Sequence, residues 1–182
     1  MEAWIRIDEV RGEWQAIVQK VDLASYTYGY SIRLDAANHL QFFVANSSEG
    51  TACSVTDANP IPEGDWLHIA GTFDSGSCSL FLGGTAVDSE VGTIETVGYH
   101  TDSLFIGHPS SLNPGGFVGA IDEVRISSTA RYSGAFTPNS EFSVDADTSA
   151  LWHMDEGVGV SVGDVSGNNN VGTLNGGDWI IP

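Results

Sequence analysis

Residues 65–84 read Asp65-Trp-Leu-His-Ile-Ala-Gly-Thr-Phe-Asp-Ser-Gly-Ser-Cys-Ser-Leu-Phe-Leu-Gly-Gly84, which is two alternating runs joined by a turn. In a strand, every second side chain lies on the same face. The first run therefore places four residues on one face: Leu67, Ile69, Gly71 and Phe73. The second run does the same with Cys78, Leu80 and Leu82. Between them, Gly76 can adopt a positive φ, so the stretch predicts a β-hairpin at the centre of a sheet.

Short apolar or alternating runs recur at about ten-residue intervals along the chain, the spacing of a β-sandwich or barrel. We expect strands at 2–8, 14–20, 28–34, 39–46, 51–57, 66–74, 77–83, 103–107, 119–127, 150–154 and 171–174. Segment 128–147 is patterned more weakly. We expect it to form a helical turn near 129–132 and to pack Tyr132, Phe136 and Phe142 onto a surface. No run keeps a helical period for more than ten residues, so the predicted class is all-β, in one domain spanning 1–182.

The composition is acidic and excludes several kinds of partner. The 182 residues include 24 Asp and Glu against 6 Lys and Arg, a formal net charge of −18. Such a field repels nucleic acid and anionic membranes, and it suits calcium or a salty exterior. No apolar run approaches the roughly 20 residues of a membrane helix, so we expect no membrane insertion. Cys53 and Cys78 allow either one disulfide, as in an extracellular protein, or two buried thiols.

The order of three stretches resembles a laminin G-like domain of the concanavalin A-like lectin/glucanase superfamily. The first is Trp-x-His-x-Ala-x-Thr-Phe-Asp at 66–74, followed by Leu-Phe-Leu-x-Gly at 80–84. The second is Leu-Phe-Ile-Gly at 104–107 with the strand at 117–126, and the third is 150–157 with 164–174. The resemblance implies a two-sheet antiparallel β-sandwich, the concanavalin A-like jelly roll.

The third stretch is displaced relative to the resembled family, where it comes near the beginning of the domain. The displacement implies either a permuted domain boundary or a piece of a tandem array. In both cases we expect segment 148–182 to supply the closing strand and a calcium loop.

Residues 164–170, Asp-Val-Ser-Gly-Asn-Asn-Asn, are the candidate calcium loop. Calcium prefers carboxylate, amide and carbonyl oxygens, and Gly167 lets the chain bend inward. We predict Asp164, Asn168 and Asn170 as metal ligands, and the resemblance adds Asp122. The alternative is a hydrated Asn/Gly turn closed by side-chain-to-backbone hydrogen bonds.

Aromatic residues are the candidate ligand-binding groups. Tyr26, Tyr28 and Tyr30 recur at period two and are expected on one face, joined by Trp14 and Phe43. Aromatic faces bind the C–H surfaces of sugars, and Arg33 and Gln41 could bond hydroxyl groups. The alternative is that these rings belong to the core, where we expect most of the large apolar groups: Trp4, Trp66, Phe73, Phe81 and Trp152.

Motifs of catalysis are absent from the sequence. Asp122 and Glu123 are adjacent in a strand, so they point to opposite faces and cannot flank one glycosidic bond. Endoglucanases of the resembled superfamily carry Glu-x-Asp-x-x-Glu, which does not occur here. The spacings of zinc sites, of serine hydrolases and of phosphate loops are also absent. We therefore expect no enzymatic activity.

These observations predict a non-catalytic recognition or adhesion module with a structural calcium ion, located outside the cell or on its surface. Its ligand would be a carbohydrate or an extracellular protein, and its other partners would be the neighbouring domains of a larger protein. The alternative is a structural spacer or assembly repeat of a surface protein, which the displaced third stretch favours. A third hypothesis is a degenerate glycoside hydrolase.

Overall fold

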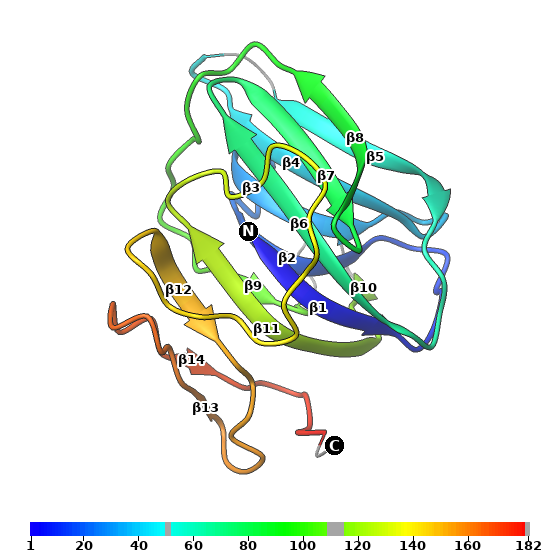
Figure 1. Ribbon diagram of the computed structural model, residues 1–182, viewed down its shortest axis with the longest axis vertical. Coiled ribbons are helices and arrows are strands. Elements are labelled where there is room, and N and C mark those ends of the chain that lie inside the picture. The colour runs from blue at the N-terminus through cyan, green and yellow to red at the C-terminus, as the bar shows by residue number, and fades with distance from the viewer. Residues whose placement is uncertain (50–51, 109–114, 181–182) are drawn as a thin grey trace.

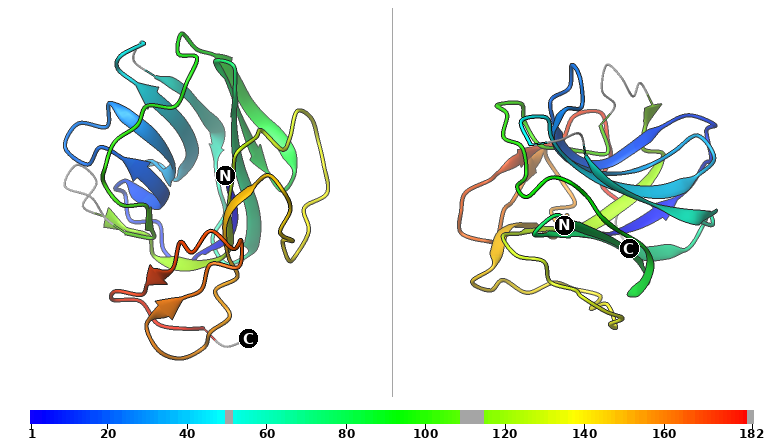
Figure 2. Two further views of the ribbon diagram at one scale, coloured as in Figure 1. Left: turned by 90° about the vertical axis from the view of Figure 1, so that its left-hand side faces the viewer. Right: turned by 90° about the horizontal axis from the view of Figure 1, so that it is seen from above.

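The computed structural model describes residues 1–49, 52–108 and 115–180, which form strands and turns without a helix. Two large sheets pack face to face (Figures 1 and 2). The first sheet contains, in spatial order, β12 (Thr148–Trp152), β11 (Gly119–Ser127), β1 (Glu2–Ile7), β6 (Trp66–Asp74), β7 (Ser77–Leu82) and β8 (Thr85–Val91). The second contains β10 (Gly115–Gly116), β2 (Gln15–Val21), β3 (Tyr28–Leu34), β4 (His39–Asn46) and β5 (Cys53–Pro60), with β9 (Phe105–Ile106) also paired to β2. The two-sheet antiparallel β-sandwich predicted from the sequence is confirmed.

A small hairpin of β13 (Ser161–Val162) and β14 (Gly172–Thr173) lies at one end of the sandwich (Figure 2, left).

All eleven predicted strands have a counterpart, although position 51 lies outside the described residues. The helical turn expected near 129–132 is wrong, because that part of the chain is bent rather than helical. Its side chains reach away from the local backbone, Arg131 to Asp145 and Tyr132 to Glu2. Across the described ranges, no helix is long and apolar enough to cross a membrane.

The hairpin β6–β7 is central in the first sheet, as predicted, because β1 and β8 pair with its two outer edges. Ile69 and Leu80 are fully buried in the core between the sheets. Gly71 faces the other sheet so closely that a Cβ atom there would lie 2.3 Å from the ring of Phe42. The absence of a side chain at Gly71 therefore leaves the room that the Phe42 ring of the other sheet occupies.

Segment 128–147 crosses the outer face of the first sheet, drawn in yellow in Figure 2. It packs three aromatic rings around the buried His68, with centroid distances of 5.5 to 6.5 Å: Phe136, Phe142 and Tyr132. This confirms the predicted packing of the segment. The part of the outer face around His68 is thus covered, and the three rings form a second apolar layer there.

A buried ion-pair network lies under this layer. Glu2 is 3% exposed, and its Oε1 accepts hydrogen bonds from Nε and Nη2 of Arg125 at 2.9 and 2.7 Å. Its Oε2 accepts a bond from the Tyr132 hydroxyl at 2.7 Å and lies 3.0 Å from Nε2 of His68. The carboxylate is therefore surrounded by donors from β6, β11 and segment 128–147.

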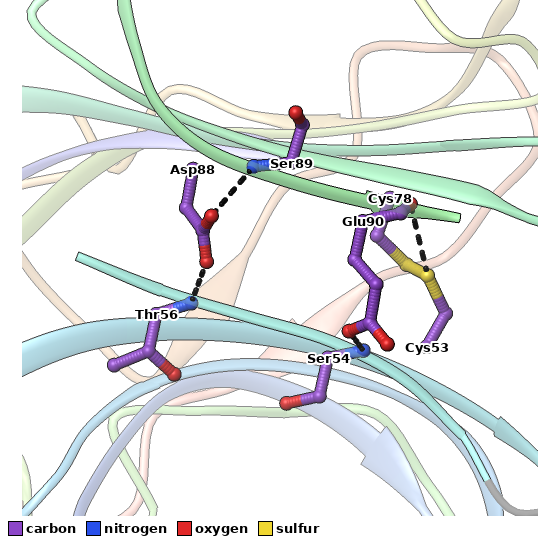
Figure 3. The surroundings of a disulfide bond; sticks show 7 residues. All are labelled: Cys53, Ser54, Thr56, Cys78, Asp88, Ser89 and Glu90. Atoms are coloured by element: carbon purple, nitrogen blue, oxygen red, sulfur yellow. Dashed lines mark hydrogen bonds between the residues drawn. A yellow bond between two sulfur atoms is a disulfide. The ribbon is translucent and has the colours of Figure 1, made fainter. Parts of the chain in front are cut away.

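A disulfide between Cys53 and Cys78 joins β5 of the second sheet to β7 of the first (Figure 3). Nearby, two carboxylates of β8 accept bonds from backbone N–H groups of the edge strand β5. Asp88 bonds Thr56 N at 2.8 Å, and Glu90 bonds Ser54 N at 3.3 Å. Unpaired strand edges promote aggregation, and charged side chains are one means of blocking them. Part of the acidic composition thus serves to close this edge of the sandwich.

Candidate functional site

Five of the predicted ligand-binding residues meet on the outer face of the second sheet. Ile32 and Leu34 are in the core, so strand alternation places Arg33 of β3 on the opposite, outer face. Phe43 of β4 is outward for the same reason, since Phe42 and Val44 are core residues. We name the assembly the Arg33 cluster, and its members are Trp14, Tyr26, Arg33, Gln41 and Phe43.

The Arg33 guanidinium is the centre of this cluster. Its carbon lies 4.3 Å from the ring centroid of Trp14, 4.5 Å from that of Phe43 and 5.4 Å from that of Tyr26. These distances are within the range of cation–π contacts. Nε of Arg33 donates to Oε1 of Gln41 at 2.8 Å, and Nε2 of Gln41 donates to the Thr56 hydroxyl at 3.2 Å. Burial without a nearby carboxylate lowers the pKa of Arg33.

The prediction that three tyrosines share one face is wrong. Tyr26 lies in the turn before β3 with φ 57°, and its backbone N–H donates to the carbonyl of Asp22. This left-handed residue breaks the alternation, so Tyr26 joins Phe43 on the outer face at a centroid distance of 5.9 Å. Tyr30, in contrast, lies on the inner side of β3. Tyr30 packs against the core, where burial raises its pKa to about 12, and the Tyr28 hydroxyl bonds Ser48 instead.

Two polar residues of this face were not predicted from the sequence. The Tyr26 hydroxyl donates to Oε1 of Gln19 at 2.9 Å, and Nε2 of Gln19 donates to the carbonyl of His108. Ser31 pairs in register with Gln19 and Phe43, and its buried hydroxyl has no partner among the described residues. The sequence around Gln19, Ile17-Val-Gln-Lys-Val21, does not alternate, so it gave no signal for this residue.

The candidate calcium loop closes on β12 through hydrogen bonds. Oδ1 of Asp164 accepts bonds from Leu151 N and Ser166 N, and Oδ2 accepts two from the backbone and side-chain nitrogens of Asn170. Nδ2 of Asn168 and Nδ2 of Asn170 both donate to the carbonyl of Ser149. Burial opposes ionisation of Asp164, but the bonds from Ser166, Asn170 and Leu151 outweigh it and lower its pKa to about 2.

A carboxylate has about four lone-pair positions, and four N–H donors occupy those of Asp164. In this arrangement the loop does not fit a calcium ion, and a cation would have to displace some of these donors. Among the residues that the structure describes, no group of three or more His, Cys, Asp or Glu side chains could hold a metal. Calcium binding by this loop stays a prediction.

Asp122 is engaged elsewhere, and within the described parts of the chain its side chain does not bond the loop. Its Oδ1 accepts the backbone N–H of Glu123, and burial raises its pKa, with Glu123 and Asp155 adding to the effect. Glu123 has φ 51° and is 4% exposed, and its carboxylate lies 2.6 Å from Nδ1 of His153 and accepts the N–H of Phe142. These contacts tie β11 to β12 and to segment 128–147.

The architecture defines the class, a β-sandwich of two antiparallel sheets with an aromatic cluster on one outer face. The chain belongs to the laminin G-like family of the concanavalin A-like lectin/glucanases superfamily, because that family model matches residues 1–135. Segment 148–182 lies beyond the match. No curated protein matches the sequence.

One solved structure shows the same fold at low sequence identity, and two others superpose less well. A proposed carbohydrate-binding protein from Bacteroides ovatus superposes with a TM-score of 0.68 and 18% identity, over 96% of this chain and 53% of that one. The chain therefore spans about half the length of that protein. A SAP-like pentraxin from Limulus polyphemus gives a TM-score of 0.47 at 12% identity, over 72% of this chain and 64% of that one. An S-layer domain-containing protein from Clostridium thermocellum gives a TM-score of 0.30 at 22% identity, over 71% of this chain and 63% of that one.

Proposed function

We propose that this chain is a non-catalytic carbohydrate-binding module of a larger extracellular or cell-surface protein, with an adhesive role. The observation that carries the proposal is the Arg33 cluster, in which three aromatic rings surround one guanidinium on an outer sheet face. The lectin/glucanase superfamily and the name of the Bacteroides ovatus protein support it as analogies, and fold analogy alone is a weak basis for function.

The chemistry of the cluster suits a sugar ring. Trp14 and Tyr26 are half-buried, so each keeps part of its ring accessible, while the buried Phe43 supports them from below. Aromatic rings offer a rigid apolar surface, and a few placed polar groups then fix the orientation of the ligand. Gln41 and Arg33 supply such polar groups, and the Arg33 guanidinium lies between the rings. The disulfide and the acidic surface suit an oxidising, extracellular location.

Replacing Trp14 with alanine is expected to weaken carbohydrate binding by about tenfold or more, because truncating an aromatic anchor typically costs about 2 kcal/mol. A glycan array identifies the ligand, and isothermal titration calorimetry measures the change. Trp66→Ala is the matched control, since Trp66 is 42% exposed on the first sheet and lies outside the cluster. Equal losses in both variants, or unchanged binding by Trp14→Ala, would exclude the Arg33 cluster as the sugar site.

A structural role in assembly is the second candidate, and the C-terminal segment favours it. Val158, Val160 and Val171 are 78%, 62% and 57% exposed around the small hairpin. Exposed apolar groups gathered on one segment are a feature of surfaces that pack against another protein. Sedimentation velocity distinguishes the two candidates, because a spacer would associate end to end and bind no glycan.

Substituting Asp164 with asparagine tests the C-terminal loop and the calcium prediction together. Its carboxylate accepts four N–H bonds, so we expect the variant to lose about 1–2 kcal/mol of stability, equally in calcium and in EDTA. Thermal melts of both proteins in both buffers measure this. A melting temperature that rises with calcium in the wild type only would instead establish the calcium site predicted from the sequence.

A further inference from the structure

We infer that the Arg33 cluster recognises the carboxylate of an acidic sugar, a uronic acid residue within an otherwise weakly charged polysaccharide. This inference rests on the proposed function, and it names the chemical class of the ligand. The guanidinium of Arg33 differs in its partners from the other lysine and arginine side chains of the chain.

Among the lysine and arginine residues, Arg33 is the one whose charged group meets neither a carboxylate nor a backbone carbonyl in the part of the chain that the structure describes. Four arginines pair with acids: Arg6 with Asp8, Arg11 with Glu13, Arg125 with Glu2 and Arg131 with Asp145. The ammonium of Lys20 donates to the carbonyl of Asp102. Arg33 donates only through Nε, to Gln41, and no described residue bonds its two terminal nitrogens. In a chain with 24 acidic residues, an arginine kept apart from all of them is available for an external anion.

The surrounding rings contact the guanidinium, so the N–H groups at its edge are the ones that can bind a ligand. Trp14 and Phe43 lie at 4.3 and 4.5 Å, and Gln41 occupies Nε. A guanidinium presents its remaining N–H groups as a planar fork that matches the two oxygens of a carboxylate. Partial burial removes water from the guanidinium, and this desolvation lowers the pKa of Arg33. The two oxygens of a bound carboxylate would replace the hydrogen bonds of that lost water. The sugar ring bearing that carboxylate would then lie against the exposed parts of Trp14 and Tyr26.

The net charge of the chain selects against dense polyanions. A formal charge of −18 repels a heavily sulfated chain, whereas the Debye length of about 8 Å at physiological salt screens most of this field from a single bound carboxylate. One unpaired guanidinium also balances one negative charge. A polysaccharide with isolated uronic acid residues therefore fits better than a polysulfate.

The test compares each acidic oligosaccharide with its own methyl ester, which removes the charge and keeps the sugar. The probes are oligogalacturonides and glucuronic-acid-substituted xylo-oligosaccharides, together with neutral glycans, titrated into the whole chain at 0.15 M salt. We expect the free acid of the bound probe to bind about 10- to 100-fold more tightly than its ester, the range of charge-assisted hydrogen bonds. Arg33→Gln should abolish this difference, and Arg33→Lys, which keeps the charge without the fork, should retain part of it.

Arg6→Gln is the matched control, because Arg6 also stacks on a tryptophan, Trp66, at 5.7 Å, but on the first sheet and with a carboxylate partner. It should leave the acid-to-ester ratio unchanged. Binding of neutral glycans or esters as tightly as acids would overturn this inference and leave the proposed function standing. Binding of no glycan by the wild type would overturn both. Near-UV circular dichroism shows whether Arg33→Gln folds. If it does not, the acid-to-ester affinity ratios of the wild type and of Arg33→Lys still test whether Arg33 recognises a carboxylate.

Discussion

Glu2→Gln is expected to lower the free energy of unfolding by about 3 kcal/mol or more. The variant leaves the Arg125 guanidinium, whose residue is 7% exposed, buried without its counter-charge. Breaking a buried ion pair by removing one partner typically costs about 3–5 kcal/mol, because the remaining charge is left uncompensated. Urea denaturation of the two proteins at pH 7 measures the difference.

Glu13→Gln is the control for the ion pair itself. Glu13 pairs with Arg11 at 3.3 Å, and both side chains are about 40% exposed, so its loss should cost about 0–1 kcal/mol. The double variant Glu2→Gln, Arg125→Met should recover much of the stability, since it removes the unpaired charge. A Glu2→Gln variant as stable as Glu13→Gln would show that the network contributes nothing beyond a surface pair.

The same carboxylate should make stability fall in acid. Burial opposes its ionisation, but the bonds from His68, Tyr132 and Arg125 outweigh burial and lower the pKa of Glu2 from 4.5 to about 2. Because the folded pKa is depressed, this contribution is fully present above about pH 4.5 and is lost as the pH falls toward 2. The wild type should therefore lose its advantage over Glu2→Gln across that window. An advantage that stays constant down to pH 2 would contradict the assignment.

The sequence predicted the fold well because strands of a sandwich show their alternation locally. Ile69 and Leu80 fell on the predicted inner faces, and the hairpin between them was placed at the centre of its sheet. Strand β8 was missed because it lies at an edge and is mostly exposed, so its pattern Thr-Ala-Val-Asp-Ser-Glu-Val lacks an apolar face. Trp66 was expected in the core but is 42% exposed at the first position of β6, where the Arg6 guanidinium lies over its ring.

The candidate site was less predictable, because it depends on conformations that periodicity does not encode. Tyr26 has a left-handed backbone conformation, so its ring lies on the outer face of the second sheet and not on the face that Tyr30 occupies. The donors of Asp164 include Leu151, 13 residues away, and a loop of Asn and Asp gives no sign of whether its oxygens face donors or a cation. The pairing of Glu2 with Arg125 spans 123 residues and is likewise beyond local pattern.

Removing the disulfide is the second change with a large expected effect. Cys53 and Cys78 are 25 positions apart in the sequence. A cross-link that closes a loop of about this length stabilises the folded state by about 3 kcal/mol in the chain-entropy model. Both cysteines are fully buried, so Cys53→Ala, Cys78→Ala avoids placing a new polar group in the core. We expect urea denaturation of this double variant to show that loss.

The reductant supplies the internal control. Dithiothreitol should lower the stability of the wild type toward that of the double variant and should leave the double variant unchanged. The carboxylates of Asp88 and Glu90 still bond the free edge of β5 in both cases, so the strand should remain docked while the global stability falls. A wild type that is equally stable with and without reductant would show that the bond does not contribute to folding, and an oxidising location would lose its main structural support. If reductant lowers the stability of the wild type to that of the double variant, the packing of the two sheets depends on the disulfide. Disulfide bonds persist mainly outside the reducing interior of a cell.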